Sequence, residues 1–254
     1  MSRHATAPDD VVETFEAASR NERAALLVLE PLAAFLQAHD LGGGEIEAVP
    51  VGDGRSNVTY VLRTGGREMV LRRPPRPPLP PSAHDVLREA RVMAALQGRA
   101  AVPRILAVCD DETVIGAPFY LMEKVEGVVL HDRVPPELDT PEFCRTVGDE
   151  LIDALVDLHA VDWRACGLEG FGKPTGYLDR QLRRFGGLWD VNKTREMPLV
   201  QEVGDWLAAN KPESPTATIV HGDYRLGNTM LAADAPARLI AIFDWEMATI
   251  GDPL

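Results

Sequence analysis

The 254-residue sequence has little cysteine, few aromatic residues and a deficit of basic charge. Its three cysteines, Cys109, Cys144 and Cys166, lie far apart without a CxxC spacing. Neither a disulfide framework nor a thiolate metal site is therefore expected, and a reducing cytoplasm is the expected location. The 26 Lys and Arg residues against 39 Asp and Glu residues leave a formal charge of −13. This balance argues against a nucleic-acid partner, which is normally met with a surplus of basic residues.

Long apolar runs are also lacking. The most apolar early stretch, residues 24–37, is interrupted by Glu30 and Pro31. It is shorter than the roughly 20 apolar residues that a helix needs to cross a bilayer. The first ten residues include Asp9 and Asp10 and lack the basic head and apolar run of a signal peptide. We therefore expect neither a membrane segment nor export.

The pattern over residues 45–124 predicts a β-rich lobe. Alternation over 45–51, 57–63 and 68–73 predicts an antiparallel meander with a turn at 64–66. Apolar runs at 105–109 and 119–122 complete a five-stranded antiparallel sheet. After a proline-rich segment, Ser82 and Asp85 have the spacing of a helix capping box. A helix is therefore expected to start close to Ser82 and to pack against the sheet.

The flanking segments are predicted to be helical. Residues 11–39 have a helix-forming composition and end at three glycines, so residues 1–44 are expected to form an N-terminal helical extension. Residues 125–254 are expected to form a second, mostly helical lobe with short strands near 218–220, 229–231 and 239–243. Its clearest helix has one apolar face, made of Phe143, Val147, Leu151, Leu155 and Leu158. The predicted fold class is α+β, a β-rich lobe followed by an α-rich one.

The strongest chemical signal is the loop His-Gly-Asp-Tyr-Arg-Leu-Gly-Asn at 221–228, which lies between two short apolar runs. An H-x-D-x-x-x-x-N loop serves phosphoryl transfer by placing a carboxylate near the attacking hydroxyl and an amide oxygen near a metal ion. Asp244 follows the next apolar run and can supply a second metal-binding carboxylate. The two motifs together favour a catalytic loop over a turn that is only hydrogen-bonded.

With these motifs the sequence resembles the aminoglycoside phosphotransferase and choline kinase family, which has a protein-kinase-like bilobal fold. The resemblance covers residues 41–254 and is strongest to a branch associated with acyl-CoA dehydrogenases. The motifs that carry it are GRSN at 54–57, VLRRPP at 70–75, GAPFYLME at 116–123, DWE at 244–246 and GDPL at 251–254. It implies that Asp223 is the catalytic base and that Arg225 meets the transferring phosphate. It also implies that Asn228 and Asp244 hold Mg²⁺ and that His221 braces the loop through backbone hydrogen bonds.

The expected nucleotide site lies in the β-rich lobe. Gly52, Gly54 and Ser56 fall between the first two strands, where a loop with few side chains can cover phosphates. A simple hairpin turn is the alternative reading of these residues. By the resemblance, Glu123 and Val125 border the segment that presents backbone groups to adenine.

The third strand departs from the kinase pattern, because Arg72 stands where a kinase has a nucleotide-binding Lys. Strand alternation puts Val70 and Arg72 on one face, so if Val70 lines the adenine pocket, Arg72 points at the phosphates. Glu89 is the expected partner of Arg72, since a buried carboxylate needs a cation. The alternative is that Glu89 pairs only locally, with Arg88 or Arg91 on a solvated face.

These residues predict an ATP- and Mg²⁺-dependent phosphotransferase that acts on the hydroxyl of a small molecule. One alternative is a nucleotide-binding pseudokinase or inactive fragment that regulates a partner enzyme, which Arg72 favours. The other is a metallophosphoesterase, which needs further His and Asp ligands that the sequence does not offer. Relatives continue beyond the point where this sequence stops, so the C-terminal helices of the second lobe are expected to be missing.

The acceptor stays open between two classes. The net charge favours a polycation such as an aminoglycoside. The family branch instead points to hydroxyacyl groups on coenzyme A, with an acyl-CoA dehydrogenase as the candidate partner.

Overall fold

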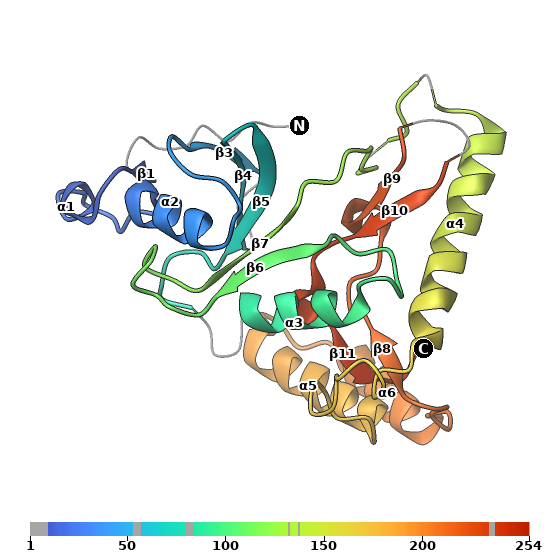
Figure 1. Ribbon diagram of the computed structural model, residues 1–254. Coiled ribbons are helices and arrows are strands. Elements are labelled where there is room, and N and C mark those ends of the chain that lie inside the picture. Colours follow the sequence, from blue (N-terminus) through green and yellow to red (C-terminus); the bar gives the residue numbers. More distant parts are fainter. Residues whose placement is uncertain are drawn as a thin grey trace.

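The computed structural model describes residues 10–52, 57–79, 84–131, 133–136, 138–233 and 237–253. The first half is built on a five-stranded antiparallel sheet with the strand order β3-β4-β5-β7-β6 (Figure 1). These strands are β3 (Glu47–Val51), β4 (Val58–Thr64), β5 (Arg67–Arg73), β6 (Ile105–Cys109) and β7 (Phe119–Glu123). The predicted five-stranded sheet is therefore confirmed.

A tight turn sets the register of the central hairpin. Gly65 and Gly66 join β4 to β5 with φ angles of 55° and 76°. Two consecutive residues with positive φ are typical of a type I′ turn, whose twist matches that of the flanking strands. The turn pairs Thr64 with Arg67 and Thr59 with Arg72. Side chains alternate from this register, so Arg72 lies on the opposite face from its neighbours in β5.

The two faces of the sheet are covered by different elements. On one face, Leu62 and Leu71 belong to a buried cluster with Leu32 and Leu36 of α2 (Leu29–Ala38). On the other face, Met122 belongs to a cluster shared with α3 (Val86–Leu96) and with the second half of the chain. Arg72 faces this second cluster, and the sheet therefore directs it toward the rest of the molecule.

The N-terminal segment is less helical than predicted. It contains β1 (Val11–Val12), a four-residue helix α1 (Phe15–Ala18) and β2 (Leu27–Val28), which pairs with β1 in parallel. Only α2 agrees with the helix expected over 11–39. The run Leu26–Val28 is buried at consecutive positions, which suits a strand better than a helix with one apolar face. Helix-forming composition could not reveal this burial.

The predicted start of α3 is also wrong. Asp85, and not Ser82, is the N-cap residue, since its side chain accepts a hydrogen bond from the backbone N–H of Arg88 at 2.9 Å. Such a cap satisfies one of the free N–H groups of the first helical turn. Ser82 lies outside the described residues. The predicted inward face of α3 is present, because Val86, Ala90, Met93 and Leu96 are buried.

The second half combines three helices with short strands. The helices are α4 (Pro141–Ala160), α5 (Tyr177–Asn192) and α6 (Pro198–Ala209). The strands are β8 (Thr218–Val220), β9 (Thr229–Leu231), β10 (Leu239–Ile242) and β11 (Thr249–Gly251). In antiparallel pairs, β8 joins β11 and β9 joins β10. None of the helices in the described part of the chain has the length and apolar character needed to span a membrane.

Candidate active site

Two short strand pairs hold the 221–228 loop. The loop begins directly after β8 and ends directly before β9, so both of its ends are fixed. Because β10 runs antiparallel to β9, the residues that follow β10 return to the end of the loop. The backbone N–H of Phe243 accordingly donates to the carbonyl oxygen of Asn228 at 2.8 Å. This pairing brings the two sequence motifs together.

His221 braces the loop, as expected, through backbone hydrogen bonds. Its Nδ1 lies 3.2 Å from the backbone nitrogen of Asp223, and its Nε2 lies 2.8 Å from the carbonyl oxygen of Phe243. A backbone N–H can only donate, so Nδ1 accepts and Nε2 carries the proton. Burial lowers the pKa of His221, against the raising effect of the Phe243 carbonyl. The neutral imidazole of His221 therefore holds the loop.

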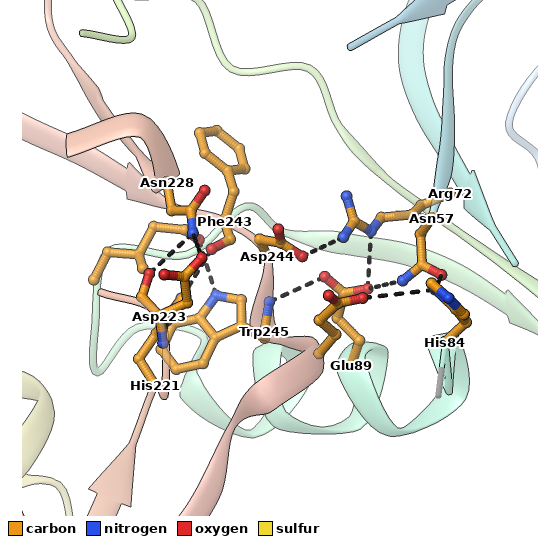
Figure 2. Close-up of polar contacts among 12 residues, drawn as sticks. Asn57, Arg72, His84, Glu89, His221, Asp223, Asn228, Phe243, Asp244 and Trp245 are labelled. Carbon is orange, nitrogen blue, oxygen red and sulfur yellow. Dashed lines mark hydrogen bonds and ion pairs between the residues drawn. The ribbon is translucent and has the colours of Figure 1, made fainter. Parts of the chain in front are cut away.

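Asp223 and Asn228 are joined directly. The Asn228 amide nitrogen donates to the Asp223 carbonyl oxygen at 2.9 Å and to Asp223 Oδ2 at 2.8 Å. Arg225 Nε donates to the same Oδ2 at 3.2 Å. Both bonds of the Asn228 amide use its nitrogen, so its oxygen points away from Asp223 (Figure 2). Asn228 is buried, whereas the Asp223 side chain is 43% exposed and accessible to a substrate.

Asp244 occupies the position between the loop and the sheet. Its backbone is left-handed, with φ 63° and ψ 60°, a conformation that Asp adopts more readily than most residues. Figure 2 shows its side chain between Asn228 on one side and Arg72 on the other. Arg72 Nη2 donates to Asp244 Oδ1 at 2.5 Å. The β-rich half and the loop region thus meet at this carboxylate.

The predicted pair of Arg72 and Glu89 is present. Arg72 Nε donates to Glu89 Oε2 at 2.9 Å, and the backbone N–H of Trp245 donates to Glu89 Oε1 at 3.1 Å. The local alternative is not what the structure has, because Arg88 donates to Ala248 and Phe171 while Arg91 donates to the carbonyls of Gly167 and Glu169. The pair is therefore an interaction between sheet and helix.

Burial has opposite effects on the two charges of this pair. It raises the pKa of Glu89, against the lowering effect of Arg72. It also acts to lower the pKa of Arg72, but the nearby carboxylates of Glu89 and Asp244 favour the charged guanidinium, and that pKa is raised. In both hydrogen bonds named above, Glu89 is the acceptor. The guanidinium of Arg72 and the backbone N–H of Trp245 therefore stabilise the ionised carboxylate.

The remaining predicted residues lie farther along the sheet. Val70 packs beside the second cluster and pairs with Met122 of β7. Glu123 ends β7, and its carboxylate accepts from the backbone N–H of Arg104, the residue before β6, at 2.9 Å. Val125 follows β7 and is half-buried. Gly52 is exposed with φ 91°, and Gly54 and Ser56 lie outside the described residues.

Sequence reasoning missed the part that His84 plays beside this site. His84 Nδ1 lies 3.1 Å from Asn57 Oδ1, and Asn57 Nδ2 donates to Glu89 Oε2 at 3.4 Å. Asn57 belongs to the sequence motifs only as a letter of GRSN, and His84 belongs to none of them. Asn57 lies directly before a strand and His84 directly before a helix cap, so neither residue belongs to a periodic pattern that could have indicated its role.

The donor set at the centre suits a hard cation. Asn228 and Asp244 offer amide and carboxylate oxygens, which Mg²⁺ prefers. Across the described residues, no group of three or more His, Cys, Asp or Glu side chains could hold a metal ion by itself. Mg²⁺ commonly takes one or two carboxylates and completes its shell with substrate phosphates and water. The residues present therefore fit a cation that arrives with a phosphate-bearing ligand.

Comparison with known proteins gives consistent results over this region. Residues 47–254 match the phosphotransferase enzyme family. The chain is 36% identical over 211 residues to mouse acyl-CoA dehydrogenase family member 10, a match that covers 83% of this chain and 20% of that protein. It is 37% identical over 213 residues to chicken acyl-CoA dehydrogenase family member 11, covering 83% of this chain and 27% of that protein. The chain thus spans about a quarter of the length of these curated relatives.

Solved structures have the same fold. A Ralstonia eutropha protein named as an aminoglycoside phosphotransferase superposes with a TM-score of 0.78 at 35% identity, covering 89% of this chain and 67% of that one. The GDP complex of aminoglycoside 2'-phosphotransferase-IIIa superposes with a TM-score of 0.62 at 19% identity, covering 87% of this chain and 73% of that one. At that lower identity the likeness concerns the fold alone.

Proposed function

Because the chain belongs to the phosphotransferase enzyme family, we propose that it transfers the γ-phosphoryl group of ATP to a hydroxyl group of a small molecule. The observation that supports this most is the row formed by Asp223, Asn228, Asp244 and Arg72 (Figure 2). It combines an accessible carboxylate, two groups with oxygens for a cation and a guanidinium for phosphates, which is the set that phosphoryl transfer requires.

In the proposed reaction, Asp223 orients the acceptor hydroxyl and takes its proton. The acceptor oxygen forms a bond to the γ-phosphorus as the bond to the β–γ bridging oxygen breaks, and ADP leaves. We assign the proton to Asp223 Oδ1, because Oδ2 is already engaged by Asn228 and Arg225. Asn228 thus fixes the rotation of the carboxylate before a substrate arrives.

The other residues bind and orient the nucleotide. Arg72 contacts phosphate oxygens, and Glu89 keeps its guanidinium in place. Asn228 and Asp244 hold Mg²⁺, which neutralises charge on the phosphates when bound. Arg225 turns from Asp223 toward the transferring phosphate, and the glycine loop at 52–56 covers the phosphates. This assigns the nucleotide to residues 45–124, with its adenine beside Val70 and the 123–125 segment, and the acceptor to residues 125–254.

For the acceptor we favour hydroxyacyl thioesters of coenzyme A over aminoglycosides. Two curated relatives that are 36% and 37% identical to this chain are named acyl-CoA dehydrogenase family members, which suggests a hydroxylated acyl substrate and a dehydrogenase partner. The net charge of −13 would instead favour a polycation. Net charge says little about the local field beside Arg72 and Arg225.

A nucleotide-binding pseudokinase is the second proposal, and the observation that favours it is Arg72. A planar guanidinium replaces the compact ammonium that kinases use at this position. In the structure it is already committed to both Glu89 and Asp244. Such a protein would bind ATP and Mg²⁺ and act on a partner enzyme without turnover.

Two measurements on the wild-type protein separate these proposals. Thermal shift with ATP and Mg²⁺ reports binding, and an ADP-release assay across hydroxyacyl-CoA, aminoglycoside and water as acceptors reports turnover. The enzyme requires both signals, and the Asp223→Ala variant should then lose a factor of about 10² to 10⁴ in turnover while still binding ATP. Full activity in that variant would remove Asp223 from the mechanism, and binding without any turnover would favour the pseudokinase.

A further inference from the structure

Three segments that are distant in sequence meet beside Glu89. Asn57 lies directly before β4, His84 lies directly before the N-cap residue of α3, and Glu246 lies two residues after Asp244. His84 Nδ1 lies 3.1 Å from Asn57 Oδ1 and 3.8 Å from Glu246 Oε2. Asn57 Nδ2 donates to Glu89 Oε2, the same oxygen that accepts from Arg72 Nε. A chain of polar contacts therefore runs from His84 through Asn57 and Glu89 to Arg72 (Figure 2).

We propose that Asn57 is a positioning residue of the phosphotransfer site, with His84 fixing the direction of its amide. This inference rests on the proposed function, because the group that Asn57 ultimately positions is the guanidinium that we assign to the phosphates. Asn57 itself contacts neither the acceptor nor the row that contains Asp223. It acts through Glu89, and its contribution should appear in nucleotide binding.

The chemistry of the partners sets the direction of every hydrogen bond in the chain. A carboxylate can only accept, so the Asn57 amide must turn its nitrogen toward Glu89 and its oxygen toward His84. His84 must then donate from Nδ1, because an amide oxygen is also only an acceptor. An inverted amide would place two acceptors against each other at Glu89. His84 is therefore the residue that keeps the useful orientation of Asn57.

Burial makes these contacts matter. Glu89 is 1% exposed and Asn57 is 6% exposed, so water cannot easily replace a lost partner. Oxygen Oε1 of Glu89 is held by the Trp245 backbone, while Oε2 is shared by Arg72 and Asn57. Without Asn57, Oε2 would lose one of its donors. The carboxylate could then rotate and carry the guanidinium away from its present direction.

The test is a double-mutant cycle read by nucleotide binding. Titration calorimetry with AMP-PNP and Mg²⁺ should give an approximately 10-fold weaker Kd for Asn57→Ala than for wild type, since a buried hydrogen bond to a charged group is lost. In a Glu89→Gln background the same substitution should change Kd less than about twofold, because residues in one network are not additive. Asn192→Ala is the matched control, because Asn192 donates only to the Leu188 carbonyl on the exposed end of α5.

His84→Ala provides an independent variant, to be used if Asn57→Ala does not fold by circular dichroism. It should weaken AMP-PNP binding in the wild-type background and have no further effect in Glu89→Gln. An unchanged Kd in the single variants, or an equal loss in both backgrounds, would overturn the inference.

Failure of the proposed function has a different result. Wild-type protein that does not bind AMP-PNP would remove the nucleotide role altogether. Urea unfolding of the same variants then tests whether the contact between Asn57 and Glu89 contributes to the free energy of unfolding. Coupling between Asn57 and Glu89 in that cycle would show that the network stabilises the fold but has no role in nucleotide binding. The absence of coupling would show that the network does not exist.

Discussion

The guanidinium carbon of Arg88 lies 3.7 Å from the centroid of the Phe171 ring. The same side chain donates to the carbonyl oxygens of Phe171 at 2.5 Å and of Ala248 at 2.9 Å. Arg88 belongs to α3, whereas both of its partners lie in the second half of the chain. The helix that carries Glu89 is thereby fastened to the region that carries the 221–228 loop.

We expect Arg88→Met to lower the free energy of unfolding by about 1–3 kcal/mol, because it removes a cation–π contact and two hydrogen bonds but keeps much of the apolar stem. Urea denaturation measures this loss. Arg183→Met, on the exposed surface of α5, should change stability by less than about 0.5 kcal/mol. Equal stability of the two variants would show that Arg88 does not fasten α3.

Removing Arg72 should be more damaging than removing both members of its pair. Arg72→Met leaves Glu89 buried without its cation, and breaking a buried pair in this way costs about 3–5 kcal/mol. The double variant Arg72→Met with Glu89→Gln should recover a large part of that loss, since the buried charge of Glu89 is gone and Asp244, which also loses Arg72, is partly exposed to solvent. Urea denaturation at neutral pH tests this order. A double variant less stable than Arg72→Met would contradict it.

His221 predicts a dependence of stability on pH. Burial lowers its pKa in the folded protein below the ordinary value of 6.5. On acidification the unfolded chain takes up a proton before the folded one does, so this contribution to stability is complete above 6.5 and is lost as the pH falls through the folded-state pKa. His221→Gln should be less stable near neutral pH and should lose less stability between about pH 7 and 5. Parallel pH profiles for wild type and variant would exclude this role.

Two glycines allow a matched test of close packing. A Cβ on Gly127 would lie 2.4 Å from the Leu231 carbonyl oxygen, whereas a Cβ on Gly148 would meet nothing within 4 Å. Gly127→Ala should therefore destabilise the protein by about 1–3 kcal/mol through overpacking against β9. Gly148→Ala, inside α4, should stabilise it by about 0.5–1 kcal/mol. Thermal unfolding of both variants checks the opposite signs.

Sequence patterns predicted the elements whose signal is local. The turn at Gly65 and Gly66, the strands around the 221–228 loop and the apolar stripe of α4 are all visible as short periodic runs. The Arg72–Glu89 pair was predictable for another reason, because strand alternation and the need to compensate a buried charge point to the same partner.

The missed features depend on tertiary contacts. β11 has three residues, too few for a periodic pattern, and it forms only because β8 lies beside it. Asn57 and His84 are 27 residues apart, and His84 adopts a left-handed backbone with φ 61° that its sequence neighbours do not require. The helix start at Asp85 was misplaced because Ser82 and Asp85 are both good caps, and only the folded chain distinguishes them.

The ion pair between Arg72 and Asp244 has a consequence for how a ligand can bind between these two side chains. Each of these two side chains neutralises charge on the other, so neither presents an uncompensated charge to solvent. A ligand that carries anionic phosphates together with a cation offers each side chain a replacement partner. Its entry is then an exchange of ion pairs, and an anionic ligand without a cation would leave Asp244 without a counterion, whereas Arg72 keeps Glu89.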